Sequence, residues 1–141
     1  MIGPTGRVSP VPGDPVDVLD AAGHRMGRGL YNPRAGIACR LLARPDEPVD
    51  AALVRRRLTT AFEYRRRAGL AAEAYRLCWS EADGLPGLVV DRYGGVSVVQ
   101  CLTLGMALHR HVRLQSLAAL QPYVVLALLA AIPVYLVALM W

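Results

Sequence analysis

The sequence predicts an α+β fold, in which a small antiparallel β domain is followed by an amphipathic helix, a β-hairpin connector and a C-terminal apolar helix. Short strand-like runs separated by glycine and proline turns fill residues 1–45. Residues 46–69 repeat apolar side chains with a helical period, and residues 116–141 carry no charged side chain. A chain of 141 residues has room for one ordinary domain or two small ones.

The first 45 residues predict a meander of three short strands, which is the raw material of a small antiparallel barrel. The strands are expected at residues 16–19, 25–31 and 37–43. Gly27 and Gly29 interrupt the second of them. Glycines inside a strand indicate a bulge, or a place where another backbone or a ligand approaches closely.

Residues 46–69 predict one amphipathic helix. Asp46 or Asp50 can cap its beginning, and Gly69 lies just beyond its end. The side opposite the apolar arc carries four arginines, Arg55, Arg56, Arg66 and Arg67. This face is either a solvated surface, supported by the neighbouring Glu63, or a surface that contacts phosphate groups.

A strand at residues 74–79 and a hairpin complete the connector. Residues 81–94 read EADGLPGLVVDRYG. Their glycines and proline predict a tight turn before a short apolar strand that begins at Leu88, and Tyr93-Gly94-Gly95 turns the chain into a second strand at residues 96–101.

The C-terminal segment predicts a membrane-spanning helix by its hydropathy. Residues 122–141, from Pro122 to Trp141, are almost continuously apolar and long enough to cross a bilayer core. Tyr123 and Trp141 lie where interfacial aromatic residues are found, and Pro133 would kink such a helix. The alternative is a helix buried against the β domain.

Charge and cysteine usage leave the function open. All sixteen basic residues are arginine and the net charge is +5, which suits RNA and equally suits a coding sequence rich in arginine codons. The three cysteines are widely separated and form no C-x-x-C pair, so they predict neither a zinc site nor a disulfide framework. We expect no catalytic residues, no metal site and a reducing, cytoplasmic location, with membrane association through residues 122–141 as the alternative.

Three blocks of the sequence resemble one family in that family's own order. Residues 13–44, GDPVDVLDAAGHRMGRGLYNPRAGIACRLLAR, look like the body of a PUA domain, a β pseudo-barrel that many RNA-modifying enzymes use. Residues 46–67 match the helix that follows, and EADGLPGLVVDRYG matches the connector. The family is that of the bacterial SAM-dependent methyltransferases that act on carbon 5 of cytosine in large-subunit ribosomal RNA.

The resemblance departs from the family's pattern at both ends. Residues 1–9 stand in place of the first strand of the family's PUA domain, and the likeness fades after Gly105-Met106. The glycine motif that binds SAM and the catalytic cysteines would follow there. The resemblance therefore implies a truncated chain with three parts: a partial PUA-like domain at residues 1–45, a helix and connector at 46–106, and an apolar tail at 107–141.

The resemblance implies an RNA-binding fragment of such a methyltransferase, inactive on its own, with ribosomal RNA as its partner. SAM would be the cofactor of the full-length family, and no cofactor is expected in this chain. The candidate RNA-binding residues lie on the glycine-bearing strand, on the turn after it and on the basic helix face: Arg28, Tyr31, Arg34, Arg55, Arg56, Arg66 and Arg67. The alternative is a membrane-anchored small β domain that binds something other than RNA.

Overall fold

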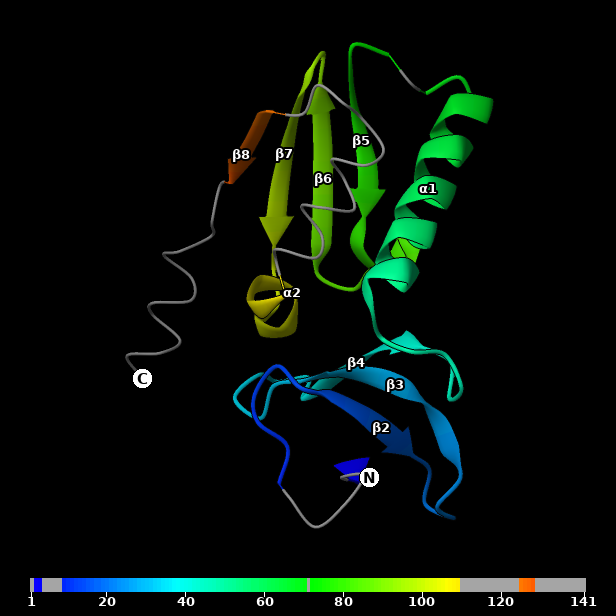
Figure 1. Ribbon diagram of the computed structural model, residues 1–141, viewed down its shortest axis with the longest axis vertical. Helices are drawn as coiled ribbons and strands as arrows, with labels where there is room; N and C mark the ends of the chain where they lie inside the picture. Colours follow the sequence, from blue (N-terminus) through cyan, green and yellow to red (C-terminus); the bar gives the residue numbers. More distant parts are fainter. Residues whose placement is uncertain (1, 4–8, 71, 110–124, 129–141) are drawn as a thin grey trace.

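The described part of the chain contains two four-stranded sheets and one long helix (Figure 1). The computed structural model describes residues 2–3, 9–70, 72–109 and 125–128. The N-terminal sheet, at the bottom of Figure 1, contains β1 (Ile2–Gly3), β2 (Pro15–Leu19), β3 (Arg25–Tyr31) and β4 (Cys39–Ala43). The C-terminal sheet above it contains β5 (Ala74–Trp79), β6 (Leu88–Tyr93), β7 (Val96–Cys101) and β8 (Val125–Leu128). The helices are α1 (Ala51–Arg67), the short 3₁₀ turn η1 (Ser80–Asp83) and α2 (Leu104–Leu108).

The N-terminal sheet is the predicted meander with one further strand, β1, paired to β2. All its pairings are antiparallel. The irregularity predicted from the two glycines is confirmed, because the register of β3 against β4 shifts between Arg28 and Gly29. A Cβ atom on Gly29 would lie 2.3 Å from the backbone oxygen of Arg40 on β4. Only glycine permits this approach of the two backbones.

The helix α1 begins where its capping residue predicts. The carboxylate of Asp50 accepts a hydrogen bond from the backbone nitrogen of Leu53 at 2.9 Å, so Asp50 and not Asp46 is the N-cap. Gly69 follows the helix with a φ of +68° and ends it. The last turn carries three arginines, whose positive charges interact favourably with the negative end of the helix dipole. They are Arg65, Arg66 and Arg67.

The hairpin of the C-terminal sheet forms as predicted, with Val90 opposite Val99. The strand β8 pairs with β7 in parallel, from Val96 opposite Val125. A helix was predicted at that place, and these four residues form a strand instead. The rest of the predicted apolar helix, residues 110–124 and 129–141, lies outside the described residues. Within the described part of the chain, no helix is long and apolar enough to cross a membrane.

One hydrophobic core joins the two sheets. Leu42 of β4 packs in the same cluster as Leu58 of α1, Val90 of β6 and Met106 of α2. All four are at most 3% exposed. Since α1 supplies buried side chains between the sheets, the N-terminal sheet and the connector pack as one unit. The boundaries at residues 45 and 106 stay predictions.

Candidate nucleic-acid interface

The outer face of α1 carries the predicted group of arginines, and all four are exposed. Arg66 pairs with Glu63 at 2.8 Å, and Arg56 pairs with Glu47. Arg55 and Arg67 form no ion pair among the described residues, although the Glu63 carboxylate that pairs with Arg66 also attracts Arg67. Arg67 lies twelve positions after Arg55, so the two stand about 18 Å apart along the helix. We call Arg55, Arg56, Arg66 and Arg67 the arginine stripe.

The other two arginines of α1 hold the helix in place. Arg57 donates hydrogen bonds to the backbone oxygens of Leu42 and Gly84, and lies 3.3 Å from a carboxylate oxygen of Glu47. Burial lowers the pKa of this guanidinium. Arg65 makes a two-point contact with Asp83 of η1, in which both side chains are about nine-tenths buried. These contacts orient the arginine stripe outward.

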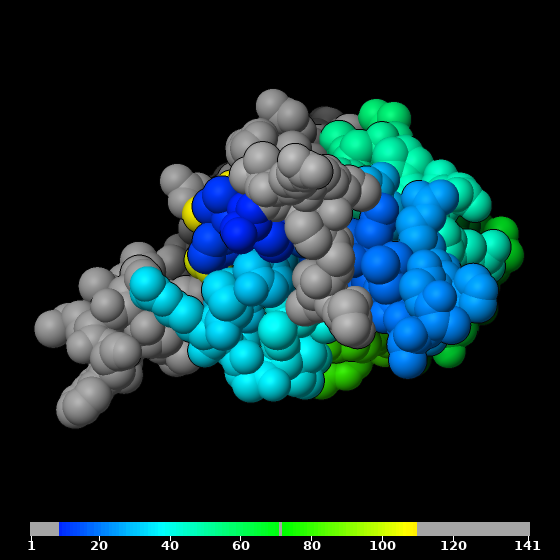
Figure 2. Space-filling model, turned by 90° about the horizontal axis from the view of Figure 1, so that it is seen from below, coloured from blue at the N-terminus to red at the C-terminus, as the bar shows by residue number. Residues whose placement is uncertain are grey.

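The candidates on the N-terminal sheet differ in their accessibility. Arg28 lies on β3 with its Nε 2.9 Å from Asp17, whose side chain is only 5% exposed, so this arginine is engaged inside the sheet. Tyr31, the last residue of β3, is half-buried. Arg34 is exposed in the loop between β3 and β4, and its side chain has no partner among the described residues. In Figure 2, which views this end of the molecule from below, the blue-to-cyan segments of the sheet form the surface.

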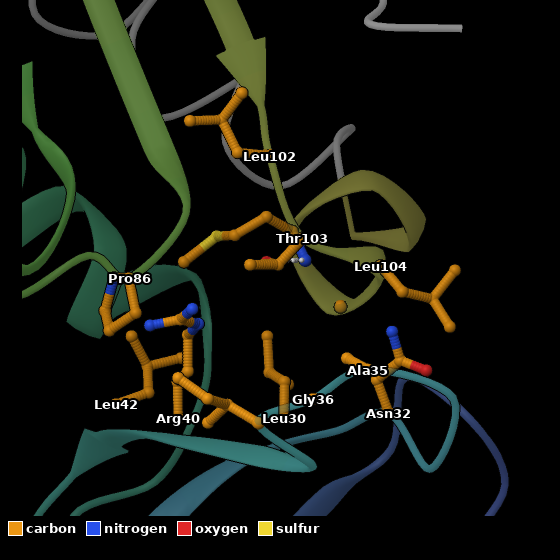
Figure 3. A pocket seen from close by; sticks show the side chains of 13 residues that line it. Leu30, Asn32, Ala35, Gly36, Arg40, Leu42, Pro86, Leu102, Thr103 and Leu104 are labelled. Carbon is orange, nitrogen blue, oxygen red and sulfur yellow. Dashed lines mark hydrogen bonds between the residues drawn. The ribbon is translucent and has the colours of Figure 1, made fainter. Parts of the chain in front are cut away.

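A pocket opens where the loop between β3 and β4 meets the start of α2 (Figure 3). Its volume is about 330 Å³. The side chains of Leu30, Arg40 and Leu42 rise from the N-terminal sheet, and Thr103 lies across from them at the start of α2. Leu102, just after β7, also lines the pocket. We call this the junction pocket.

A polar contact closes one side of the junction. Arg40, which lines the pocket, pairs with Glu81 of η1 at 2.8 Å. A hydrogen bond from the Ser80 hydroxyl, and then the Arg40 guanidinium, lower the pKa of Glu81. Glu81 therefore stays ionised and keeps its arginine partner across the physiological pH range.

Sequence reasoning missed the junction pocket. Its walls come from residues 30–42 and 86–106, which are far apart in the sequence and meet only through the shared core. The sequence signal that exists is local. Thr103 is the N-cap of α2, because its hydroxyl accepts a hydrogen bond from the backbone nitrogen of Met106 at 3.4 Å. Within the described ranges, no cluster of acidic, histidine and cysteine residues could hold a metal ion.

Comparison with known proteins identifies the same regions. A model of the PUA-like domain matches residues 4–44. Ribosomal RNA large subunit methyltransferase I from Alteromonas mediterranea is 40% identical over 113 residues, which cover 78% of this chain and 28% of that protein. The protein of the same name from Escherichia coli O1:K1 is 36% identical over 115 residues, with the same shares of both chains. Over these residues the chain is similar to the ribosomal RNA large subunit methyltransferases. It spans about 28% of the length of these curated relatives.

Solved structures share the fold. A candidate methyltransferase in complex with SAH superposes with a TM-score of 0.71 at 14% identity, covering 80% of this chain and 30% of that one. A candidate SAM-dependent methyltransferase from Streptococcus mutans gives the same score and identity, covering 31% of its chain. In these two structures the matched fold takes up about a third of the chain or less.

Proposed function

We propose that this chain binds RNA through the arginine stripe of α1. The observation that carries the proposal is that Arg55 and Arg67 stand exposed on the outer face and form no ion pair in the described part of the chain. Their separation of about 18 Å along the helix lets them contact different phosphates of one RNA strand. The match to a PUA-like domain and to ribosomal RNA methyltransferases supports RNA as the partner.

The ion pairs within the arginine stripe are weak enough for a phosphate group to replace them. The partners of Arg56 and Arg66 are surface carboxylates, and exposed ion pairs of this kind contribute at most about 1 kcal/mol. A phosphate can therefore replace or share those contacts. Arg57 and Arg65 bind groups outside the helix, and these contacts fix the orientation of the arginine stripe.

In this proposal the RNA is ribosomal. Methyl transfer from SAM belongs to the part of the relatives that this chain does not match. The relatives' names give ribosomal RNA methylation as their activity, and one solved relative is described as SAM-dependent. We assign no catalytic step to the described residues, and propose that they hold the RNA for it.

The test is the salt dependence of RNA binding by the full chain. The probe is a labelled RNA stem-loop, and its affinity is measured by fluorescence anisotropy from low to moderate salt. The double variant R55Q/R67Q should flatten the slope of log affinity against log salt by about 1.4 to 1.8, since each lost phosphate contact removes about 0.7 to 0.9. The matched control R25Q/R92Q removes the same charge elsewhere and should leave the slope unchanged. An unchanged slope in R55Q/R67Q would contradict the proposal.

A further inference from the structure

The junction pocket has the size and lining of a site for a small flat ligand. Its volume of about 330 Å³ lies at the lower end of the range for ligand pockets, which are mostly apolar and often lie between domains. Leu30 and Leu42 supply an apolar floor from the N-terminal sheet, and Leu102 supplies part of the opposite wall (Figure 3).

Polar groups converge on the same pocket. The side-chain oxygen of Asn32 accepts a hydrogen bond from the backbone nitrogen of Arg34 at 3.1 Å, which holds the loop and leaves the amide nitrogen available as a donor. Arg40 lines the pocket with its guanidinium held by Glu81. An amide and a guanidinium beside apolar walls are the groups that recognise a nucleobase, by hydrogen bonds to its edge and by stacking on its face.

The charge next to the pocket is positive. Arg34 is exposed two residues after Asn32, in the loop that forms one wall. A base in the pocket brings its own phosphate to the rim, where this arginine is free to contact it. An apolar protein side chain would use neither the Asn32 amide nor the Arg34 guanidinium, so these residues favour a nucleotide over a protein segment.

We propose that the junction pocket binds one unpaired nucleobase of RNA, with Arg34 on the phosphate of the same nucleotide. The proposal rests on the RNA-binding function above and adds to it a site that prefers single-stranded RNA. The arginine stripe contacts the backbone, and the junction pocket selects a base that is not paired.

The experiment compares two probes on the full chain by fluorescence anisotropy. One probe is a labelled RNA octamer of adenosines, and the other is an octamer of the same length with abasic riboses. The unchanged protein should bind the adenosine octamer about tenfold more tightly, as one base–protein stacking contact allows. Ala35→Phe fills the pocket and should remove this preference, and should flatten the salt slope by no more than the single phosphate contact of Arg34, about 0.7 to 0.9. Ala22→Phe, on the exposed turn between β2 and β3, is the matched control and should keep the preference.

A second pair of variants guards against a folding defect in Ala35→Phe. Leu102 is 49% exposed at the pocket and Leu70 is 54% exposed beyond α1, so either position tolerates a carboxylate. Leu102→Glu should weaken binding of the adenosine octamer about tenfold, and Leu70→Glu should change it much less. If Ala35→Phe and Leu102→Glu both keep the preference for bases, the base site is overturned while the arginine stripe stands. If the unchanged protein binds neither octamer, the base site is overturned, and the arginine stripe fails with it only if the stem-loop is not bound either. If the pocket variants lose only binding to another protein, the pocket is a protein-docking site and the proposal is overturned.

Discussion

The contact between Arg65 and Asp83 gives the sharpest test of how α1 is attached to the connector. One carboxylate oxygen of Asp83 accepts hydrogen bonds from Nη2 of Arg65 at 2.8 Å and from the backbone nitrogen of Trp79 at 2.6 Å. The other oxygen pairs with Nη1 of Arg65. The side chains of Arg65 and Asp83 are 12% and 10% exposed. The substitution Asp83→Asn removes the charge and keeps the shape.

Asp83→Asn should lower the free energy of unfolding by a large amount for so small a change in the side chain. Removing one partner of a buried ion pair leaves the other charge uncompensated and costs about 3 to 5 kcal/mol. The slight exposure of this pair places the expected value near the lower limit, at about 3 kcal/mol. For a domain of about 100 residues, such a loss lowers the melting temperature by about 10 °C or more.

Urea unfolding of the full chain, followed by circular dichroism, measures this difference directly. The control is Glu63→Gln, which breaks the exposed pair between Glu63 and Arg66 and should cost less than about 0.5 kcal/mol. The double variant R65M/D83L should recover part of the loss, because two apolar side chains leave no buried charge. A loss below 1 kcal/mol in Asp83→Asn would refute the reasoning.

Two further predictions follow from the turn glycines and from a buried thiol. Gly87 has a φ of +81°, and a Cβ there would meet Thr103 at 2.4 Å, whereas Gly94 has a φ of +58° with open space around it. Gly94→Ala should therefore lower the free energy of unfolding by about 1 to 2 kcal/mol, and Gly87→Ala should lower it distinctly more in the same assay. Equal losses would contradict the role of Thr103. Burial raises the pKa of the Cys78 thiol to about 12, so the folded state holds this proton more tightly than the unfolded state, and the stability that the neutral thiol contributes should fall as pH rises from about 9 towards 12. The variant Cys78→Ala should show a flatter decline of unfolding free energy with pH, and an identical decline would contradict the assignment.

The strands and the long helix could be predicted because their signals are local. Strand β3 and strand β7 occupy the predicted residues, since glycine, proline and asparagine turns bound each apolar run. The helix wheel also placed the arginine stripe outward. The five-residue helix α2 was missed, since so short an element has no periodic pattern to recognise.

Tertiary partners account for what the sequence could not predict. Arg28 is a candidate RNA-binding residue, and the sequence did not indicate that it pairs with Asp17 on the neighbouring strand. The role of Arg57 depends on carbonyl groups of Leu42 and Gly84, which lie 15 and 27 positions away. The apolar run at residues 125–128 also depends on a tertiary partner that the sequence does not reveal. Hydropathy favoured a helix, whereas pairing with the edge of β7 gives a strand.

The shared core also sets how the two candidate RNA contacts relate to each other. Leu42 is buried with Leu53 and Leu58 of α1, so the strand next to the junction pocket and the helix that carries the arginine stripe cannot swing independently. In the proposed mode of RNA binding, the two contacts therefore keep a fixed distance from each other. A bound strand must present a phosphate track and an unpaired base at one set separation, and an RNA with a different spacing gains from one contact only at the expense of the other.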